Sequence, residues 1–268
     1  MHRQLLIIGC GNMGGAMLAG WLAAGMDPAR FAVLDPALET APEGVALYRS
    51  VAEAEAAGEH DAVMLGFKPQ QLGQLAPGIQ SVCGDGIAVT SLLAGITLAQ
   101  LRASFPNASA HVRVMPNLAA RINKSPVILM EAGIDDARRS AAFALFDALG
   151  TAVWLEDESR FDLVTALAGS GPGFVYRFID ALARAGADLG LDRDQADALA
   201  LAMVEGAASL AAASNFSPGE LADRVASPGG MTREGLNVLD EGGALVELLT
   251  RTLAATRDRG AELSKGDS

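Results

Sequence analysis

The chain has 268 residues, of which 50% are hydrophobic and 19% are charged, so a folded core is expected and an intrinsically disordered chain is excluded. With 32 acidic against 20 basic residues its net charge is −12, which disfavours nucleic acid and anionic membrane surfaces as partners. The 2 cysteines and the 3 histidines show neither a disulfide framework nor metal-ligand spacing, and we expect a cytoplasmic protein without a metal site.

The N-terminal stretch lacks the pattern of a targeting segment. Its uninterrupted apolar run covers only residues 5–8, whereas a secretory signal needs about 7–15 apolar residues. No stretch approaches the roughly 20 apolar residues of a membrane span. We therefore expect neither a signal peptide nor a membrane-spanning helix.

The first part of the chain alternates short β-like runs with helical runs. The expected strands are brief and rich in Val, Ile and Leu, which is typical of a parallel sheet buried on both faces. They cover residues 4–9, 31–35, 45–48, 61–67, 86–91, 111–115, 126–130 and 151–156. The expected helices between them cover residues 14–25, 98–104 and 135–149. This alternation predicts a doubly wound α/β domain.

A glycine-rich motif lies directly after the first expected strand and opens the first helix. Its sequence GCGNMG places Gly9, Gly11 and Gly14 in the spacing G-x-G-x-x-G. Gly9 allows a tight turn, Gly11 lets the backbone approach a pyrophosphate, and Gly14 lets the helix pack closely on the strand. The motif predicts a Rossmann-type dinucleotide-binding domain, and the alternative is a glycine-rich turn that binds no ligand.

Two further strand ends are candidates for the cofactor site. Asp35 stands where an acid binds the adenosine ribose hydroxyls, and its carboxylate would repel a 2′-phosphate, which favours NADH over NADPH. The alternative for Asp35 is a turn-initiating Asp-Pro. The loop after the fourth strand supplies a possible cofactor wall of Gly66, Phe67, Lys68 and Pro69. Lys68 either reaches a cofactor phosphate or faces solvent.

After about residue 156 the β pattern stops and helices follow. The expected helices cover residues 174–191, 192–214 and 242–263. The second is apolar nearly all round, which indicates burial, and we expect a second subunit to cover it. The acidic run 156–158 is expected to charge the first turn of a helix. We predict two domains, a dinucleotide-binding domain over 1–156 and an all-α dimerisation domain over 157–268.

The sequence VASPGGMTREGL interrupts the helical pattern at residues 225–236. Ser227 suits a helix N-cap, and Pro228 suits the first helical position. Backbone N–H groups at this helix N-terminus are then free to bind a carboxylate, with Thr232 beside them. These N–H groups belong to Gly229, Gly230 and Met231. The alternative, an ordinary capped helix start, explains Ser-Pro but not the paired glycines and the threonine.

Other common catalytic motifs are missing from the sequence. It contains no G-x-S-x-G elbow, no P-loop and no His–Cys or His–Asp pattern that indicates a nucleophile. Hydride transfer is compatible with this pattern, because the cofactor carries the chemistry while the protein orients it.

Four motifs in one order resemble the pyrroline-5-carboxylate reductase family over nearly the whole chain. They are GCGNMG (9–14), RVMPN (113–117), AGSGPGF (168–174) and SPGGMT (227–232). The resemblance implies reduction of L-1-pyrroline-5-carboxylate to L-proline, the last step of proline biosynthesis, with NADH or NADPH. It also implies a homodimer interlocked through the helical halves, which can assemble further into a ring of dimers.

The same resemblance assigns roles to individual residues. Thr232 would be the catalytic residue that hydrogen-bonds the ring nitrogen of the substrate. The substrate carboxylate would be held by Ser227, Gly229, Gly230 and Met231. The cofactor site would be lined by Gly9, Asn12, Met13, Lys68, Pro69 and Asn117.

The chain departs from the family pattern in several places. The family commonly has Ala-Tyr and Thr-Pro where this chain has residues 173–174, Gly-Phe, and 118–119, Leu-Ala. Some members place an asparagine near the adenosine where this chain has Glu53, a second acid that favours NADH.

Two alternative functions remain open. One is another imine or β-hydroxy acid reductase of the same architecture, but the latter would carry a catalytic lysine on a helix, 161–189, that has none. The other is a non-catalytic nucleotide-binding regulator, which would have no reason to keep SPGGMT.

Overall fold

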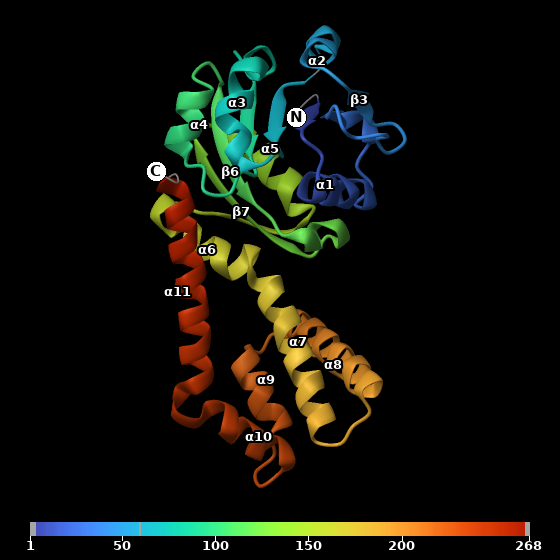
Figure 1. Ribbon diagram of the computed structural model, residues 1–268, viewed down its shortest axis with the longest axis vertical. Coiled ribbons are helices and arrows are strands. Elements are labelled where there is room, and N and C mark those ends of the chain that lie inside the picture. The colour runs from blue at the N-terminus through green and yellow to red at the C-terminus, as the bar shows by residue number, and fades with distance from the viewer. Residues whose placement is uncertain (1–3, 59, 266–268) are drawn as a thin grey trace. The chain divides into compact units, whose positions relative to one another are not determined.

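The computed structural model describes residues 4–58 and 60–265. Its N-terminal part is built on one sheet of eight strands in the order β3-β2-β1-β4-β5-β6-β7-β8 (Figure 1). The strands are β1 (Leu5–Ile8), β2 (Phe31–Leu34), β3 (Ala46–Tyr48), β4 (Ala62–Leu65), β5 (Ala88–Ser91), β6 (Ala110–Met115), β7 (Ser125–Ala132) and β8 (Gly150–Trp154). Each of the eight expected strand runs overlaps one of them, because brief buried runs of branched residues are a local signal.

The sheet is mostly rather than entirely parallel. All neighbouring strands pair in parallel except β6 and β7, which pair antiparallel with Val114 opposite Leu129. A parallel connection needs a crossover of a dozen or more residues. The link from β6 to β7 holds only the short helical turn η4 (Leu118–Ile122), so β7 must run back along β6.

Helices cover both faces of this sheet, as a doubly wound fold requires. Alternate strand residues face opposite ways, so Leu5 and Ile7 join one hydrophobic core while Leu6 and Ile8 join the other. The first core is covered by α1 (Asn12–Ala23) and α5 (Asp136–Asp147), and the second by α2 (Val51–Ala57), α3 (Leu72–Leu75), η3 (Ala76–Val82) and α4 (Leu98–Ser104).

The first core is tightly packed around α1. Trp21 stacks on Phe31 with ring centroids 5.1 Å apart, and its indole N–H donates to the Leu145 carbonyl at 2.8 Å. Gly20, on the same helix, faces η4 so closely that a Cβ there would overlap the Ala120 carbonyl oxygen. The helix can therefore approach η4 only because position 20 has no side chain.

Helices make up the rest of the chain. They are η5 (Glu158–Arg160), α6 (Phe161–Val164), the π-helical turn η6 (Thr165–Gly169), α7 (Gly171–Asp188), α8 (Arg193–Ala213), α9 (Pro218–Val225), α10 (Met231–Asp240), η7 (Glu241–Gly243) and α11 (Ala244–Lys265). The expected change from an α/β part to an all-α part is confirmed, and α9 is a helix that the sequence pattern did not indicate.

The chain forms two compact units. One unit contains Met1–Gly169 and Thr256–Ser268, and the other contains Ser170–Ala255. The first unit extends to residue 169 because Phe161 of α6 is buried against Ile128 and Met130 of the sheet. The units therefore divide later than the functional domain boundary expected after residue 156, and that boundary stays a prediction.

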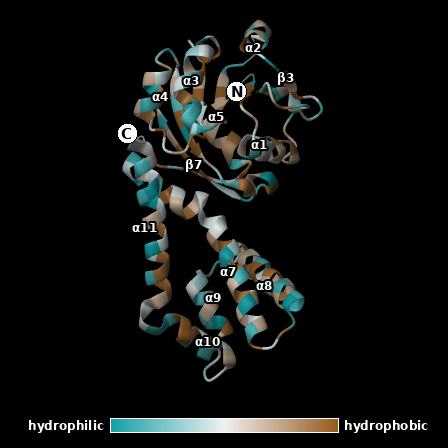
Figure 2. Cartoon of the chain, in the orientation of Figure 1, coloured by the Kyte–Doolittle hydropathy of each residue, from teal (hydrophilic) through white to brown (hydrophobic). Residues whose placement is uncertain are grey.

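Helix α8 is apolar and largely exposed within its unit. It packs on α7 through small residues, with Ala196 and Ala200 against Ala183, while larger side chains such as Leu199 (61% exposed) stay outside. Apolar residues recur along both helices (Figure 2). Among the described residues α8 is long and apolar enough to cross a membrane by length and composition, so the expectation that no such stretch exists is wrong. The burial that we expected for α8 is not achieved by contacts within one chain.

Candidate functional site

The loops that follow β1 and β4 meet backbone to backbone. Gly9 has a φ of +84°, and a Cβ at this position would lie 2.9 Å from the Phe67 nitrogen. A Cβ on Gly66 would overlap the Gly9 carbonyl oxygen. Both positions therefore require glycine, Gly9 for its dihedral angle and Gly66 for the close approach.

The other two glycines of the motif differ in their surroundings. Gly11 is exposed, and no atom lies within 4 Å of a Cβ built on it, so the backbone there is open to a ligand. Gly14 is buried at the start of α1, where a Cβ would lie 3.1 Å from the Gly9 carbonyl oxygen. This arrangement leaves the N-terminus of α1 able to face an anion.

A cavity of about 520 Å³ opens beside this loop, within the usual size range of a small-molecule site. Six of the expected cofactor residues line it, namely Gly9, Gly11, Asp35, Gly66, Phe67 and Lys68. It lies where the order of the strands reverses between β1 and β4, the place at which doubly wound sheets bind dinucleotides. The shape and the glycine backbone of the site fit a dinucleotide.

Asp35 is held at the cavity by the backbone on both sides. Its Oδ2 accepts the Cys10 N–H at 2.9 Å, and its Oδ1 accepts the Ala37 N–H at 2.9 Å. The second bond is the turn that the Asp-Pro alternative predicted, and the first orients the carboxylate toward the glycine-rich loop. Each oxygen keeps a further lone pair for a ribose hydroxyl. Burial, and then the Asp35 charge, raise the pKa of the Cys10 thiol, which keeps it protonated.

Arg49 is a cavity residue that the sequence reasoning missed. It follows β3, lines the cavity, and its guanidinium donates to the carbonyl oxygens of Leu38 and Glu39, the latter at 2.7 Å. These bonds brace the loop that follows Asp35. Position directly after β3, at the carboxyl end of a parallel strand, is the signal that could have found this residue.

Glu53 does not have the role that its charge suggested. Its Oε2 accepts the Arg49 N–H at 2.8 Å, and its own N–H donates to Ser50 Oγ at 3.3 Å. The carboxylate therefore caps α2. Because Glu53 does not line the cavity, the interpretation that it repels a 2′-phosphate loses its support.

The remaining expected cofactor residues lie outside the cavity lining. Asn12 is exposed at the first turn of α1, and Met13 packs partly against the core. Pro69 begins the short turn η2 (Pro69–Gln71) next to exposed Lys68. Asn117 is buried after β6, where its amide oxygen and nitrogen are both used.

The residues of SPGGMT form a tight turn followed by a helix. The Gly230 N–H donates to the Ser227 carbonyl at 2.9 Å, Pro228 follows Ser227, and Gly229 has a φ of +71°. These are the features of a type II turn. A Cβ on Gly230 would lie 2.6 Å from Ser227 Oγ and 3.1 Å from the Ser227 carbonyl oxygen, so a larger residue would require the serine side chain to move.

The start of α10 differs from the expectation. Ser227 was expected as the N-cap and Pro228 as the first helical residue, but α10 begins at Met231 with Gly230 as its N-cap. The reason is the positive φ of Gly229, which a right-handed helix cannot contain. The helix N–H groups without an intrahelical partner are consequently those of Met231 and the residues after it.

Exposed side chains surround this helix start. Met231 is 94% exposed, and Thr232 is exposed beside it. Arg233 pairs with Asp223 of α9 at 2.8 Å, which ties the two helices on either side of the turn. The unit formed by residues 170–255 thus contains a helix N-terminus that can bind an anion next to a hydroxyl group.

Two family models match the chain. Residues 4–95 match the model described as NADP oxidoreductase coenzyme F420-dependent, and residues 158–263 match pyrroline-5-carboxylate reductase dimerisation. With the glycine-rich loop and the cavity, these matches define an oxidoreductase that uses a nicotinamide cofactor.

Full-length relatives give the family. The pyrroline-5-carboxylate reductase of Pseudomonas aeruginosa is 33% identical over 98% of this chain and 97% of its own, and that of Methanosarcina acetivorans is 32% identical over 98% and 99%. The solved pyrroline-5-carboxylate reductase of Coxiella burnetii is 30% identical, covers 98% of both chains and superposes with a TM-score of 0.90. The chain belongs to the pyrroline-5-carboxylate reductase family.

Proposed function

We propose that this chain reduces L-1-pyrroline-5-carboxylate to L-proline with a nicotinamide cofactor. The observation that carries the proposal is the full-length similarity to reductases of this name, which includes both the cofactor-binding and the helical parts. The cofactor supplies a hydride to the C=N carbon of the substrate. The chain has to hold the substrate carboxylate, orient its ring nitrogen and place the cofactor.

The turn 227–230 and the start of α10 are the proposed substrate site. The backbone N–H groups at the start of α10 would bind the carboxylate, helped by the helix dipole. Gly229, which has no atom within 4 Å of a Cβ built on it, leaves room for a ligand against the backbone, and Ser227 Oγ adds a hydroxyl next to Gly230. The Thr232 hydroxyl would hydrogen-bond the ring nitrogen, orienting an iminium that arrives already protonated.

A direct assay tests this function. Adding pyrroline-5-carboxylate to the purified protein with a reduced nicotinamide cofactor should give oxidation of the cofactor and one proline per hydride transferred. Absorbance at the reduced-nicotinamide band and chromatographic identification of proline measure both. No turnover with this substrate, but reduction of an acyclic imine by the reduced cofactor or oxidation of a β-hydroxy acid by the oxidised cofactor, would assign the chain to another reductase of the same architecture.

NADH is the proposed preferred cofactor. Asp35 supports this, because its carboxylate lines the cavity at the expected ribose position and would repel a 2′-phosphate. Arg49 is the opposing charge, but its guanidinium is bonded to loop carbonyls. We expect kcat/KM to be about tenfold higher with NADH than with NADPH, and Asp35→Ser to reduce that ratio. Equal values for both cofactors in both proteins would remove Asp35 from cofactor selection.

A homodimer is the proposed assembly, with α8 in its interface. The match to a dimerisation model over residues 158–263 and the exposed apolar side chains of α8 support it. Light scattering should give about twice the chain mass of 27.5 kDa, or a multiple of that dimer if rings form. A monomer at micromolar concentration would contradict this assembly. A cytoplasmic location is proposed from the scarcity of cysteine.

A further inference from the structure

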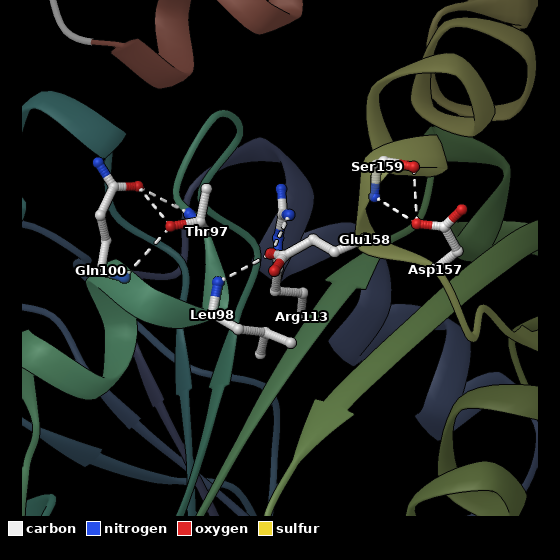
Figure 3. Close-up of polar contacts among 7 residues, drawn as sticks. All are labelled: Thr97, Leu98, Gln100, Arg113, Asp157, Glu158 and Ser159. Carbon is white, nitrogen blue, oxygen red and sulfur yellow. Dashed lines mark hydrogen bonds and ion pairs between the residues drawn. The ribbon is translucent and has the colours of Figure 1, made fainter.

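A buried ion pair lies in the sheet unit, outside the cavity lining. Arg113 of β6 donates from Nη1 to Glu158 Oε1 at 2.7 Å, and the side chains are 5% and 33% exposed. The same Oε1 accepts the N–H of Leu98, the first residue of α4, at 2.9 Å (Figure 3). The Arg113 guanidinium also lies 3.7 Å from the centroid of the Phe161 ring.

Removing this ion pair from water costs free energy, but the pair fixes a specific arrangement of the segments around it. Burial lowers the pKa of Arg113, and the bond and charge of Glu158 oppose that change. Apolar residues of similar size would commonly stabilise such a position as well or better. Apolar residues would not fix the positions of particular segments relative to one another. Here one carboxylate oxygen joins strand β6, the start of α4 and the segment after β8. Glu158 lies in the first turn of η5, as expected, and its carboxylate also acts as a junction.

A second polar contact joins the same parts of the chain. Asn117, in the loop after β6, donates from Nδ2 to the Ala168 carbonyl at 2.9 Å, and its Oδ1 accepts the Ala119 N–H at 2.9 Å. Between the two contacts, Phe161 is buried against the sheet, and Val164 packs partly beside it. The segment 158–169 is therefore attached to β6 at its start and to the loop after β6 at its end.

The loop after β6 lies on the nicotinamide side of the sheet. Asp35 and the cavity place the adenosine half of a dinucleotide at β1, β2 and β4. In a sheet of order 3-2-1-4-5-6 the second half extends across the switch point toward the carboxyl ends of the later strands. Residues 116–117 directly follow β6 at that edge.

We propose that Arg113 and Glu158 are positioning residues for the nicotinamide half of the cofactor. Their ion pair fixes the segment 158–169, and Asn117, bonded to the end of that segment, fixes the loop after β6. The inference rests on the proposed use of a nicotinamide cofactor. It assigns no contact between the pair and the cofactor, and no part in proton or hydride transfer.

The test uses the full-length protein with Arg113→Met and Glu158→Gln. Glu158→Gln is the milder change, since its amide oxygen can still accept the Leu98 N–H. For both variants we expect unchanged affinity for ADP-ribose, which lacks the nicotinamide, and a reduced fluorescence enhancement of bound NADH. In the reductase assay kcat should fall about tenfold while KM for NADH changes less than threefold. NADH deuterated at the transferred position should show a larger isotope effect on kcat than with the unaltered protein.

Gln80→Met is the matched control. Gln80 also joins two segments of the same unit, donating to the carbonyls of Ala76 and Ser104 at 2.9 and 2.8 Å, beside the second core. It should lower the Tm without changing the fluorescence of bound NADH. If Arg113→Met and Glu158→Gln behave like this control, the ion pair has only a structural role and the proposal is overturned. The fluorescence and ADP-ribose measurements decide this even if the chain fails to reduce pyrroline-5-carboxylate.

Discussion

Thr232→Ala should lower kcat by about 100-fold or more, while the KM for the nicotinamide cofactor stays nearly unchanged. In other enzymes a preorganised hydrogen-bonding group at the reacting atoms lowers the barrier by on the order of 2.7–4 kcal/mol. Thr232 is exposed at the first turn of α10, directly after the turn that we propose for the substrate carboxylate. Removal of its hydroxyl would leave the carboxylate bound but the ring nitrogen without a partner. Steady-state rates with both substrates varied separately measure the effect.

Thr232→Ser is the control for this prediction. Serine keeps the hydroxyl and loses only the methyl group, so most of the activity should return. Both variants should unfold at about the same temperature, since an exposed side chain at a helix start contributes little packing. Full turnover by Thr232→Ala would show that another group, or solvent, orients the nitrogen.

Gly20→Ala should destabilise the protein by about 3 kcal/mol, although helix propensity alone predicts a gain of about 1 kcal/mol. The added Cβ would overlap the Ala120 carbonyl oxygen and lie 2.8 Å from Leu149 Cδ2. Both neighbours belong to the buried core, so neither can move away without shifting η4 or the end of α5. The Tm should fall by about 6–12 °C, as measured by circular dichroism or calorimetry.

Gly15→Ala, in the same helix, separates the clash from propensity. The nearest atom to a Cβ there is the Cys10 carbonyl oxygen at 3.8 Å, an ordinary contact. This variant should unfold at the same or a slightly higher temperature. Equal Tm values for the two variants would mean that α1 can move away from η4 at little cost.

Local signals in the sequence located most of the fold. The eight strands are short runs such as residues 5–8 and 62–65, whose composition alone marks them as buried. The glycine motif identified the first β–α turn, because glycine is the residue that readily allows the positive φ and the close backbone approach found at Gly9. The expected cofactor residues that line the cavity, Asp35 among them, all follow strands whose ends could be read from this pattern.

Other features could not be predicted from the sequence, because they depend on a contact or a backbone conformation that residue type alone does not specify. Glu158 lies at a helix start, as its sequence position predicted, but nothing near it in sequence indicates its second role as the partner of buried Arg113, which lies 45 positions earlier. Glu53 read as a charge facing a cofactor, but the backbone of Arg49 uses its carboxylate as a cap. Helix α10 begins only at Met231 because Gly229 has a positive φ. The sequence does not predict this, since a glycine can adopt either sign of φ.

Residue type and spacing were therefore sufficient to predict the α/β-then-helical order and the dinucleotide loop, and to find the motif at 227–232. They are properties of single residues and their neighbours, which burial and backbone sterics restrict directly. The antiparallel pairing of β7, the restriction of Gly20 and Gly66 to glycine, and the junction at Glu158 needed the folded chain. Each depends on which distant backbone or charge comes within contact distance, and that is settled only when the strands and helices pack together.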